Sequence, residues 1–306
     1  MTICEAFGFI SHHFDDYNNI ITSIPSMPLF SSPTRRLSDD ILLEIADHLD
    51  PSTNEDKFTL LQLRLVCRRY NELICSRAFS HLTCISGSIQ TDSSFKHNYD
   101  FLCHSSYQHI HTSIKHLTIT SASTSRTAFS SAYGQLTPCQ LRNMTLLLSN
   151  LQTLTLANIT WTACIHSAPQ PHFFLTPHRV KHLILDNIFY SGQKNILYHI
   201  LDTIQPQTSL SFTRISHWTK NNASPPTSAI VLPSIIAHHL NESILGSILP
   251  FVTQLKSLAM NDLSVTESFL LVEDSLILHH HTLETLLLGF STPATWQGMY
   301  RIHNKL

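Results

Sequence analysis

The sequence predicts an α/β fold in which a small three-helix module near the N-terminus is followed by a solenoid with a parallel sheet. Two observations lead to this prediction. Amphipathic helical patterns occupy residues 34–82. From Ile114 onward, short segments with a fixed spacing of apolar residues recur, and segments of helical spacing lie between them. A strand, a turn and a helix repeated in this way stack into a quasi-one-dimensional array.

The first helix of the module is predicted to begin at Ser38. A serine at this position caps a free backbone amide, and the two following carboxylates, Asp39 and Asp40, interact favourably with the helix dipole. Apolar residues then recur on one helical face. These are Ile41, Leu42, Ile45 and Leu49. Asp50-Pro51 ends the helix, because proline cannot continue the hydrogen-bond ladder.

Two further helices follow a polar loop. Phe58, Leu61 and Leu65 form a shorter apolar face on the second. The third helix is predicted from Val66, Tyr70, Leu73 and Ile74, with Arg64, Arg68 and Arg69 on its solvated side. So small a module leaves much apolar surface uncovered, and such surface usually marks a partner site. The alternative is that these helices are the capping end of a larger helical domain.

The recurring segments share a template in which an apolar residue is followed by others at offsets of three, five and usually eight. The template fits Ile114/Leu117/Ile119, Leu151/Leu154/Leu156/Ile159, Val180/Leu183/Leu185/Ile188, Leu255/Leu258/Met260/Leu263, Leu283/Leu286/Leu288 and, without its first anchor, Leu210/Phe212/Ile215. The starts at 151 and 180 lie 29 residues apart, and those at 255 and 283 lie 28 apart. These intervals match leucine-rich repeats, whose period is about 20–29 residues. The alternative is an ordinary α/β domain whose strands share this spacing.

Segments of helical spacing between these strands predict helices over residues 140–149, 196–204, 235–252 and 269–280. The wide gap from 207 to 255 is interpreted as containing a surface insertion at Asn221–Pro226. Five regions follow from these patterns. They are a disordered leader (1–33), the helical module (34–82), a connecting segment with an edge strand (83–113), the repeat region (114–290) and a tail (291–306). Either the tail caps the solenoid through Trp296, Met299 and Tyr300, or the chain is a shortened form of a longer protein.

Composition narrows the class of function. The chain has 306 residues, of which 13% are charged, and a formal net charge of -2. This near-neutral balance argues against nucleic acid as the main partner. The 7 cysteines form no CxxC pair and are expected to be reduced thiols of a cytoplasmic or nuclear protein. We find no apolar run long enough to span a membrane and no secretory signal.

Histidine is abundant, with 21 copies, but the pattern does not predict a metal site. Adjacent residues of a helix point about 100° apart, so His279-His280-His281 cannot converge on one ion. His178 and His182 lie in an expected strand, where that spacing does not form a site. Cys67 is interpreted as a small core residue. Without a phosphate-binding glycine loop or a nucleophile elbow, we expect no cofactor and no catalytic site.

The helical module resembles the F-box family. The resemblance rests on Leu37–Ile45, then Leu49-Asp50, then Leu63–Ile74, read as LRLVCRRYNELI. The family motif opens Leu-Pro-x-Glu and ends Leu-x-x-Val-Cys-Arg-x-Trp-x-x-Leu. Ser38, Asp40 and Tyr70 replace the usual proline, glutamate and tryptophan. With the leucine-rich repeats behind it, the chain resembles a large fungal-type family of substrate receptors.

The resemblance implies a non-catalytic substrate-recognition subunit of a Skp–cullin–F-box ubiquitin ligase. Residues 37–74 would bind the Skp-family adaptor. The adaptor-facing residues implied are Leu37, Ser38, Ile41, Leu42, Ile45, Leu49, Val66, Tyr70 and Leu73. The alternative is a scaffolding repeat protein whose F-box-like helices only cap the solenoid. A hydrolase is a more distant third reading, which a pocket with a Ser-His-acid geometry would revive.

A protein substrate would bind the outward positions of the repeat strands, because successive side chains of a strand alternate between the two faces of the sheet. The named candidates are His116, Thr118, Thr153, Thr155, His182 and Ile184. The corresponding positions on the other strands are Ser209, Ser211, Ser257, Ala259, Thr285 and Leu287. This surface is polar but nearly uncharged. It suits hydrogen bonding to a protein partner, although a merely solvated sheet face would have the same composition.

Overall fold

The computed structural model describes residues 38–66, 68–86, 102, 104, 108–121, 134–162, 177–191, 196–217, 229–238, 245–246, 248–263, 268–290 and 299–303. The chain forms two compact units, Met1–His48 and Leu49–Leu306, which are described separately. Several sequence expectations lie outside the described residues. They are the leader (1–33), Leu37, Cys67, the insertion at 221–226 and Trp296.

The described part of the first unit is helix α2 (Asp39–Asp47) with its two caps. The Ser38 hydroxyl oxygen accepts a hydrogen bond from the Ile41 amide at 3.3 Å, so the predicted N-cap is confirmed. Leu42 and Ala46 are buried, whereas Ile41 and Ile45 are exposed.

The second unit begins with helices α3 (Asn54–Val66) and α4 (Arg68–Ala78), which pack against each other. Leu60 of α3 and Ile74 of α4 are fully buried. Two details differ from the sequence prediction. Val66 belongs to α3 rather than to the third helix. The face of α3 that carries Phe58 and Leu65 is exposed, because Leu60 takes the buried position instead.

A long sheet follows, and it confirms the predicted fold class. Its strand order is β1-β2-β4-β5-β6-β8-β10-β11-β12, and every neighbouring pair is parallel except β11 with β12. The strands are β1 (His81–Ser86), β2 (His116–Ser121), β4 (Thr153–Thr162), β5 (His178–Ser191), β6 (Ile204–His217), β8 (Ser234–His238), β10 (Ser257–Leu263), β11 (Thr285–Phe290) and β12 (Met299–His303). Strand β3 (Gly134–Leu136) pairs with β4, and β7 (Ile230–Val231) with β9 (Val252–Thr253).

The repeat template becomes rows of buried side chains that cross the sheet from strand to strand. One row is Leu82, Leu117, Leu154, Leu183, Leu210, Ile235, Leu258 and Leu286. The next is Cys84, Ile119, Leu156, Leu185, Phe212, Ala237, Met260 and Leu288. Each strand therefore places two anchors in a core that it shares with its neighbours, which is why no repeat is stable alone.

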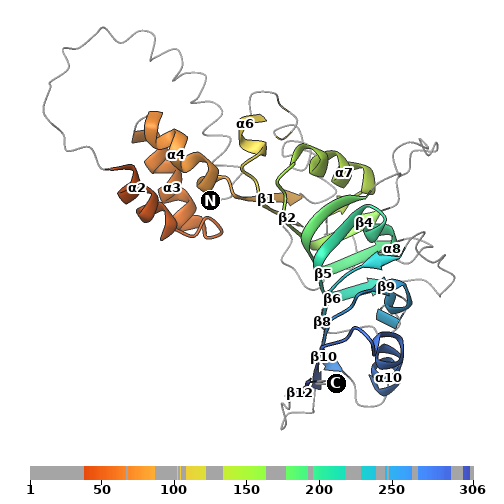
Figure 1. Cartoon of the computed structure of the whole chain (residues 1–306). Coiled ribbons are helices and arrows are strands. Elements are labelled where there is room, and N and C mark those ends of the chain that lie inside the picture. Colours follow the sequence, from red (N-terminus) through yellow and green to blue (C-terminus); the bar gives the residue numbers. More distant parts are fainter. Residues whose placement is uncertain are drawn as a thin grey trace, which may run out of the picture. The chain divides into compact units, whose positions relative to one another are not determined.

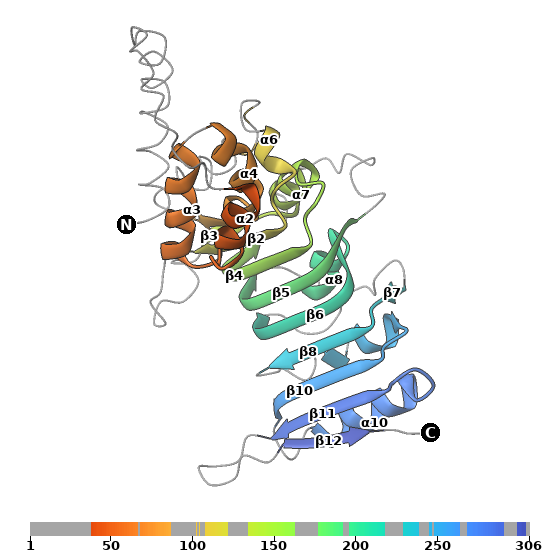
Figure 2. The same cartoon turned by 60° about the vertical axis from the view of Figure 1, so that its left-hand side comes forward.

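Helices cover the buried side of the sheet (Figure 1). They include α7 (Pro138–Leu147), α8 (Ile196–Leu201) and α10 (Ser268–His279), with the short helices α6 (Gln108–His111) and η2 (Leu249–Phe251). Thr137 and Gln140 form a capping box at the start of α7. The strands lie side by side in order of sequence, as Figure 2 shows. We call the opposite side of the sheet its open face.

The predicted helix over residues 235–252 is wrong in its first part and at its end, whereas residues 245, 246 and 248–251 are helical. Ser234–His238 is strand β8, which lies between β6 and β10, and β9 occupies 252–253. The apolar pair Ile235-Ile236 fits either period, and β-branched residues favour a strand. Ile235 and Ala237 are buried while Ile236 is half-buried, so the alternation of a strand prevails. The gap between repeats thus contains another member of the sheet.

Strands β5 and β6 are longer than the template predicts, at 14 residues each. Asn158, Asn187 and Arg214 share a left-handed backbone, with φ of 51°, 53° and 51°. Asn187 donates a side-chain hydrogen bond to Asn158 across β4 and β5 at 2.7 Å. After this break the strands resume with Ile159, Ile188 and Ile215 in register. In the tail, Met299 and Tyr300 lie in β12 along the last parallel strand.

Candidate protein-binding surfaces

The first candidate surface is the exposed side of α2. Ile41 and Ile45 are four residues apart and therefore lie on one helical face, where they are 47% and 42% exposed. Leu43 is also exposed, and it points to the other side of the helix. Of the predicted adaptor residues in this segment, Ser38 is exposed at the N-cap and Leu42 is buried.

Helix α3 carries a second exposed apolar pair. Phe58 and Leu65 are seven residues apart, on one face, and are 61% and 70% exposed. The sequence analysis identified them as apolar positions but did not assign them to a site. The sequence did contain a signal of their exposure. Polar Thr59 and Gln62 lie beside them on the helix, so the apolar stripe is narrower than a stripe that faces a core usually is. The predicted residues Leu49, Tyr70 and Leu73 are half-buried.

Helix α3 is joined to the first strand, to α4 and to the residues that follow α4. The Lys57 ammonium donates a hydrogen bond to the backbone carbonyl of His81 at 2.5 Å, and burial lowers the pKa of this lysine. The Arg64 guanidinium lies 4.5 Å from the centre of the Phe79 ring and donates to the Asn71 side chain at 2.7 Å. Helix α3 therefore contacts the start of the sheet through Lys57, while its side with Phe58 and Leu65 stays open.

The second candidate surface is the open face of the sheet, where the predicted substrate residues fall into register. The first outer row is His81, His116, Thr153, His182, Ser209, Ser234, Ser257 and Thr285. The second outer row is Thr83, Thr118, Thr155, Ile184, Ser211, Ile236, Ala259 and Leu287. Register thus places the six named candidates on three adjacent strands. Ser234 and Ile236 were missed, because β8 was not predicted.

Side chains of the open face also contact one another across strands. The rings of His81 and His116 stack with centroids 4.1 Å apart and planes 9° from parallel. The His182 ring nitrogen Nδ1 lies 2.8 Å from the Ser209 hydroxyl. Desolvation lowers the pKa of both His81 and His116. Further along β5 and β6, Asp186 and Arg214 form an ion pair at 3.2 Å.

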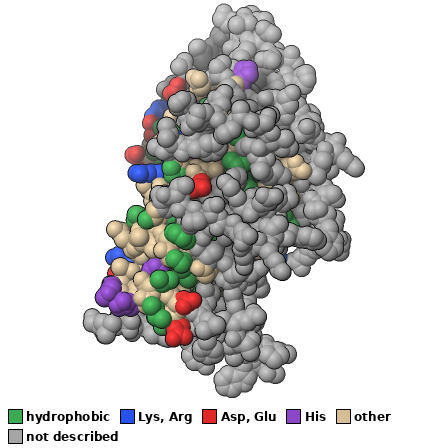
Figure 3. Space-filling model, turned by 90° about the vertical axis from the view of Figure 1, so that its right-hand side faces the viewer, with side chains coloured by type: hydrophobic (Ala, Val, Ile, Leu, Met, Phe, Trp, Pro, Cys, Tyr) green, Lys and Arg blue, Asp and Glu red, His purple; other side chains and the backbone are tan. Residues whose placement is uncertain are grey.

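Exposed apolar residues also occur on α10, on the helix-covered side. Leu276, Ile277 and Leu278 are exposed, and Ile277 reaches 63%. In the lower part of the view in Figure 3, hydrophobic side chains gather beside acidic and histidine side chains. His279 is buried and its Nε2 lies 3.1 Å from the Leu249 carbonyl oxygen, whereas His280 and His281 are exposed.

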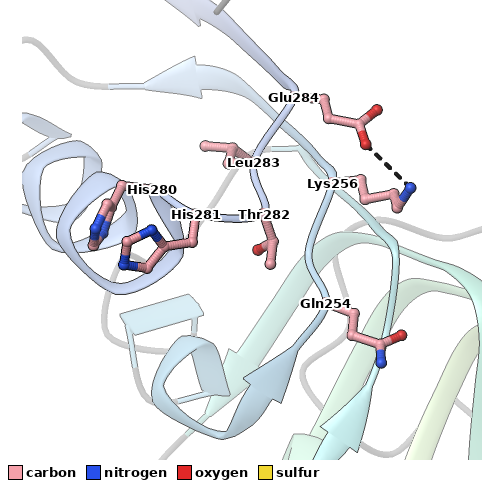
Figure 4. Close-up of a pocket in the computed structure, with 7 residues that line it drawn as sticks. All are labelled: Gln254, Lys256, His280, His281, Thr282, Leu283 and Glu284. Atoms are coloured by element: carbon pink, nitrogen blue, oxygen red, sulfur yellow. Dashed lines mark ion pairs between the residues drawn. The ribbon is translucent and has the colours of Figure 1, made fainter. Parts of the chain in front are cut away.

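A small pocket lies between the end of α10 and the turns that precede β10 and β11 (Figure 4). It is lined by Gln254, Lys256, His280, His281, Thr282, Leu283 and Glu284. Lys256 and Glu284 pair at 3.1 Å, so its charged groups neutralise each other. No group of three or more histidine, cysteine or acidic side chains that could hold a metal ion occurs among the described residues. None of the helices described is long and apolar enough to cross a membrane.

Comparison with known proteins gives a family match. The family model of the F-box domain matches residues 35–82, which include α2, α3 and α4. No curated protein and no solved structure matches the chain. The chain therefore contains an F-box domain at its N-terminal end. An F-box domain indicates, in general, a substrate-recognition role in a Skp–cullin–F-box ubiquitin ligase. F-box domains typically bind the Skp-family adaptor, and F-box proteins are generally non-catalytic adaptors.

Proposed function

We propose that this chain is the substrate receptor of a Skp–cullin–F-box ubiquitin ligase that acts in the cytoplasm or nucleus. The F-box helices bind the Skp-family adaptor, and the open face of the sheet binds a protein substrate. The chain has no catalytic step of its own in this proposal. It raises the effective concentration of the substrate at the transfer machinery, which converts an encounter into an almost intramolecular reaction.

The observation that carries the proposal is the exposure of apolar residues on the F-box helices. Ile41, Ile45, Phe58 and Leu65 are all more than 40% exposed. Exposed side chains of this size favour a partner surface, and apolar anchors supply most of the energy at such interfaces. We propose these four as the main adaptor contacts. Leu42 is buried and is a weaker candidate than its neighbours.

The alternative proposal is a scaffolding protein whose F-box helices only cap the sheet. The Lys57–His81 hydrogen bond favours this alternative, since it joins α3 to β1. A pure cap, however, has no use for the exposed pair Phe58 and Leu65. The similarity to fungal-type receptors with leucine-rich repeats also remains part of the proposal.

Co-purification with the adaptor tests these alternatives. The full chain is co-expressed with a Skp-family adaptor and captured through a tag on the chain. We expect the adaptor to co-purify with the wild type and to be lost in the Ile45→Asp and Phe58→Asp variants. The Thr155→Asp variant, on the open face, is the matched control and should retain the adaptor. A wild-type chain that folds but captures no adaptor would favour the capping alternative.

A further inference from the structure

The open face is not uniform, because three imidazoles lie in one row at the end nearest β1. On β1, β2, β4, β5 and β6 the first outer row reads His81, His116, Thr153, His182 and Ser209, which we call the imidazole row. Four of its members contact each other in two pairs. The rings of His81 and His116 stack, and the His182 ring lies 2.8 Å from the Ser209 hydroxyl. Every member of the row can donate or accept a hydrogen bond.

Two lysines flank this row where the strands begin. The Thr153 amide donates to the Lys115 carbonyl (3.0 Å), and the His182 amide donates to the Gln152 carbonyl (2.9 Å). Lys115 and Gln152, which immediately precede β2 and β4, therefore lie at positions equivalent to that of Lys181 in β5. We call these three residues the basic rim. The Lys181 ammonium donates to the Gln152 side chain at 3.3 Å, and both lysines are exposed.

Neither the imidazole row nor the basic rim contains a carboxylate. Besides burial, His116, Lys57 and Arg77 lower the pKa of His81, and Asp50 opposes them. Lys115 and His182 likewise lower the pKa of His116. On β5, the acidic residue Asp186 is paired with Arg214. In the pocket beside α10, Glu284 neutralises Lys256. Among the described residues, by contrast, no acidic residue pairs with Lys115 or Lys181 of the basic rim.

We infer that the imidazole row and basic rim bind an acidic polypeptide segment of the substrate. The inference rests on the proposed function and adds the charge of the substrate to it. Charge complementarity carries it, since ammonium, imidazole and hydroxyl groups all donate to carboxylate or phosphate oxygens. Five strands about 4.8 Å apart span about 19 Å, which matches about six residues of an extended chain.

The titration of the row gives the binding a characteristic pH dependence. Desolvation and then the neighbouring cationic groups lower the pKa of His81 and His116 below 6.5, so both rings are neutral at pH 7.5. A bound anion opposes that shift and raises these pKa values. The complex therefore takes up protons, and the segment binds more tightly as the pH falls from 7.5 to 6.0.

Peptide binding to the full chain tests the inference. The probes are three fluorescent 12-residue peptides of alternating glutamate and serine, of glutamine and serine, and of phosphoserine and glycine. Anisotropy titrations are run at pH 7.5 and 6.0. We expect one or both anionic peptides to bind, severalfold more tightly at pH 6.0, and the glutamine peptide not to bind. The two anionic peptides distinguish carboxylate from phosphate as the recognised group. Equal binding of the neutral peptide, or no binding of either anionic one, would overturn the inference.

A matched pair of double variants locates the site. His116→Gln with Lys181→Gln removes one imidazole and one ammonium from the proposed site. His280→Gln with Lys256→Gln makes the same chemical change at the pocket beside α10. We expect the first variant to lose about fivefold to tenfold in affinity, together with much of the pH dependence. The second should bind as the wild type does. Equal losses in both variants would contradict the site, and circular dichroism checks that each is folded.

The adaptor is absent from these titrations, so the two proposals fail independently. A chain that binds acidic peptide but no adaptor retains this inference and loses the ligase assignment. A chain that binds the adaptor but no acidic peptide keeps the assignment and loses the inference.

Discussion

The Lys57 ammonium in α3 donates a hydrogen bond to the backbone carbonyl of His81 in β1 at 2.5 Å, and the lysine side chain is buried. This carbonyl stands at the first residue of the edge strand of the sheet. A lysine stem thus fills space between helix and strand while its charged end satisfies a backbone acceptor. The contact joins helix α3 of the F-box domain to the first strand of the sheet.

Removing this side chain should destabilise the second unit. In Lys57→Ala the His81 carbonyl loses its donor and the buried stem leaves a cavity, so we expect a loss of about 2–4 kcal/mol. Urea denaturation of the full chain, followed by circular dichroism, measures it. Lys115→Ala is the control, since that lysine is exposed and should change stability by about 0.5 kcal/mol or less. Equal stabilities for the two variants would refute the structural role of Lys57.

Stability should also fall on acidification. Burial lowers the pKa of His279 below its ordinary value of 6.5, and its hydrogen bond to Leu249 only partly opposes this. A lowered pKa means that the unfolded chain binds the proton first. The stability that neutral, buried His279 contributes to the fold is therefore complete above pH 6.5 and is lost as the pH falls below that value. The urea midpoint, measured from pH 8.0 to 5.5, should decrease below 6.5.

His279→Gln should weaken that pH dependence, whereas His280→Gln, at an exposed neighbour, should not. Because desolvation also lowers the pKa of His178, His81 and His116, the slope should decrease rather than vanish. A urea midpoint that rises as the pH falls would contradict this prediction, because buried neutral imidazoles lose stability on acidification.

Two adjacent residues of β4 test the assignment of the two faces. Leu154 is fully buried in the row that joins neighbouring strands, while Thr155 lies on the open face. Leu154→Ala should cost about 2–5 kcal/mol, because it leaves a cavity within the shared core. Thr155→Ala should cost about 1 kcal/mol or less. Thermal denaturation compares the two variants. If Thr155→Ala were the less stable of the two, the assignment of the buried and open faces of the sheet would be wrong.

The asparagine pair at the break in β4 and β5 makes a separate prediction. Asn187 has a φ of 53° and donates to Asn158 at 2.7 Å. Both Asn187→Gly and Asn187→Ala lose the hydrogen bond, but only alanine adds strain in the left-handed region. We expect alanine to be less stable than glycine by about 1–2 kcal/mol. If alanine proves equal or better, this backbone conformation is not maintained in solution.

The sequence predicted most of the sheet because each parallel strand needs two buried anchors at alternate positions. The sequence shows these anchors as pairs of leucines two residues apart, such as Leu154 with Leu156 and Leu183 with Leu185, and all four are buried. Strand β8 escaped prediction because its anchors, Ile235 and Ala237, include no leucine and sit beside Ile236. The extension of β5 past Asn187 escaped as well, since a left-handed residue breaks the alternation on which the template depends.

The candidate surfaces were predictable to a different degree. Alternation alone assigned Thr155 and His182 to one face. It could not show that His81 stacks on His116, because that contact depends on the register between two strands 35 residues apart in sequence (116 minus 81). Helical spacing likewise grouped Phe58 with Leu65. That this side is exposed follows from tertiary packing around Leu60, which a single helix pattern does not contain.

The central claim is that the exposed apolar side of α2 binds a Skp-family adaptor, and a calorimetric titration of purified adaptor into the full chain tests it most directly. Ile41→Asp and Leu43→Asp place the same charge on opposite sides of this helix, both at exposed positions. We predict saturable binding to the wild type and to Leu43→Asp, and a loss of about tenfold or more in Ile41→Asp. Wild-type affinity in Ile41→Asp, or no binding to the folded wild-type chain, would contradict the account.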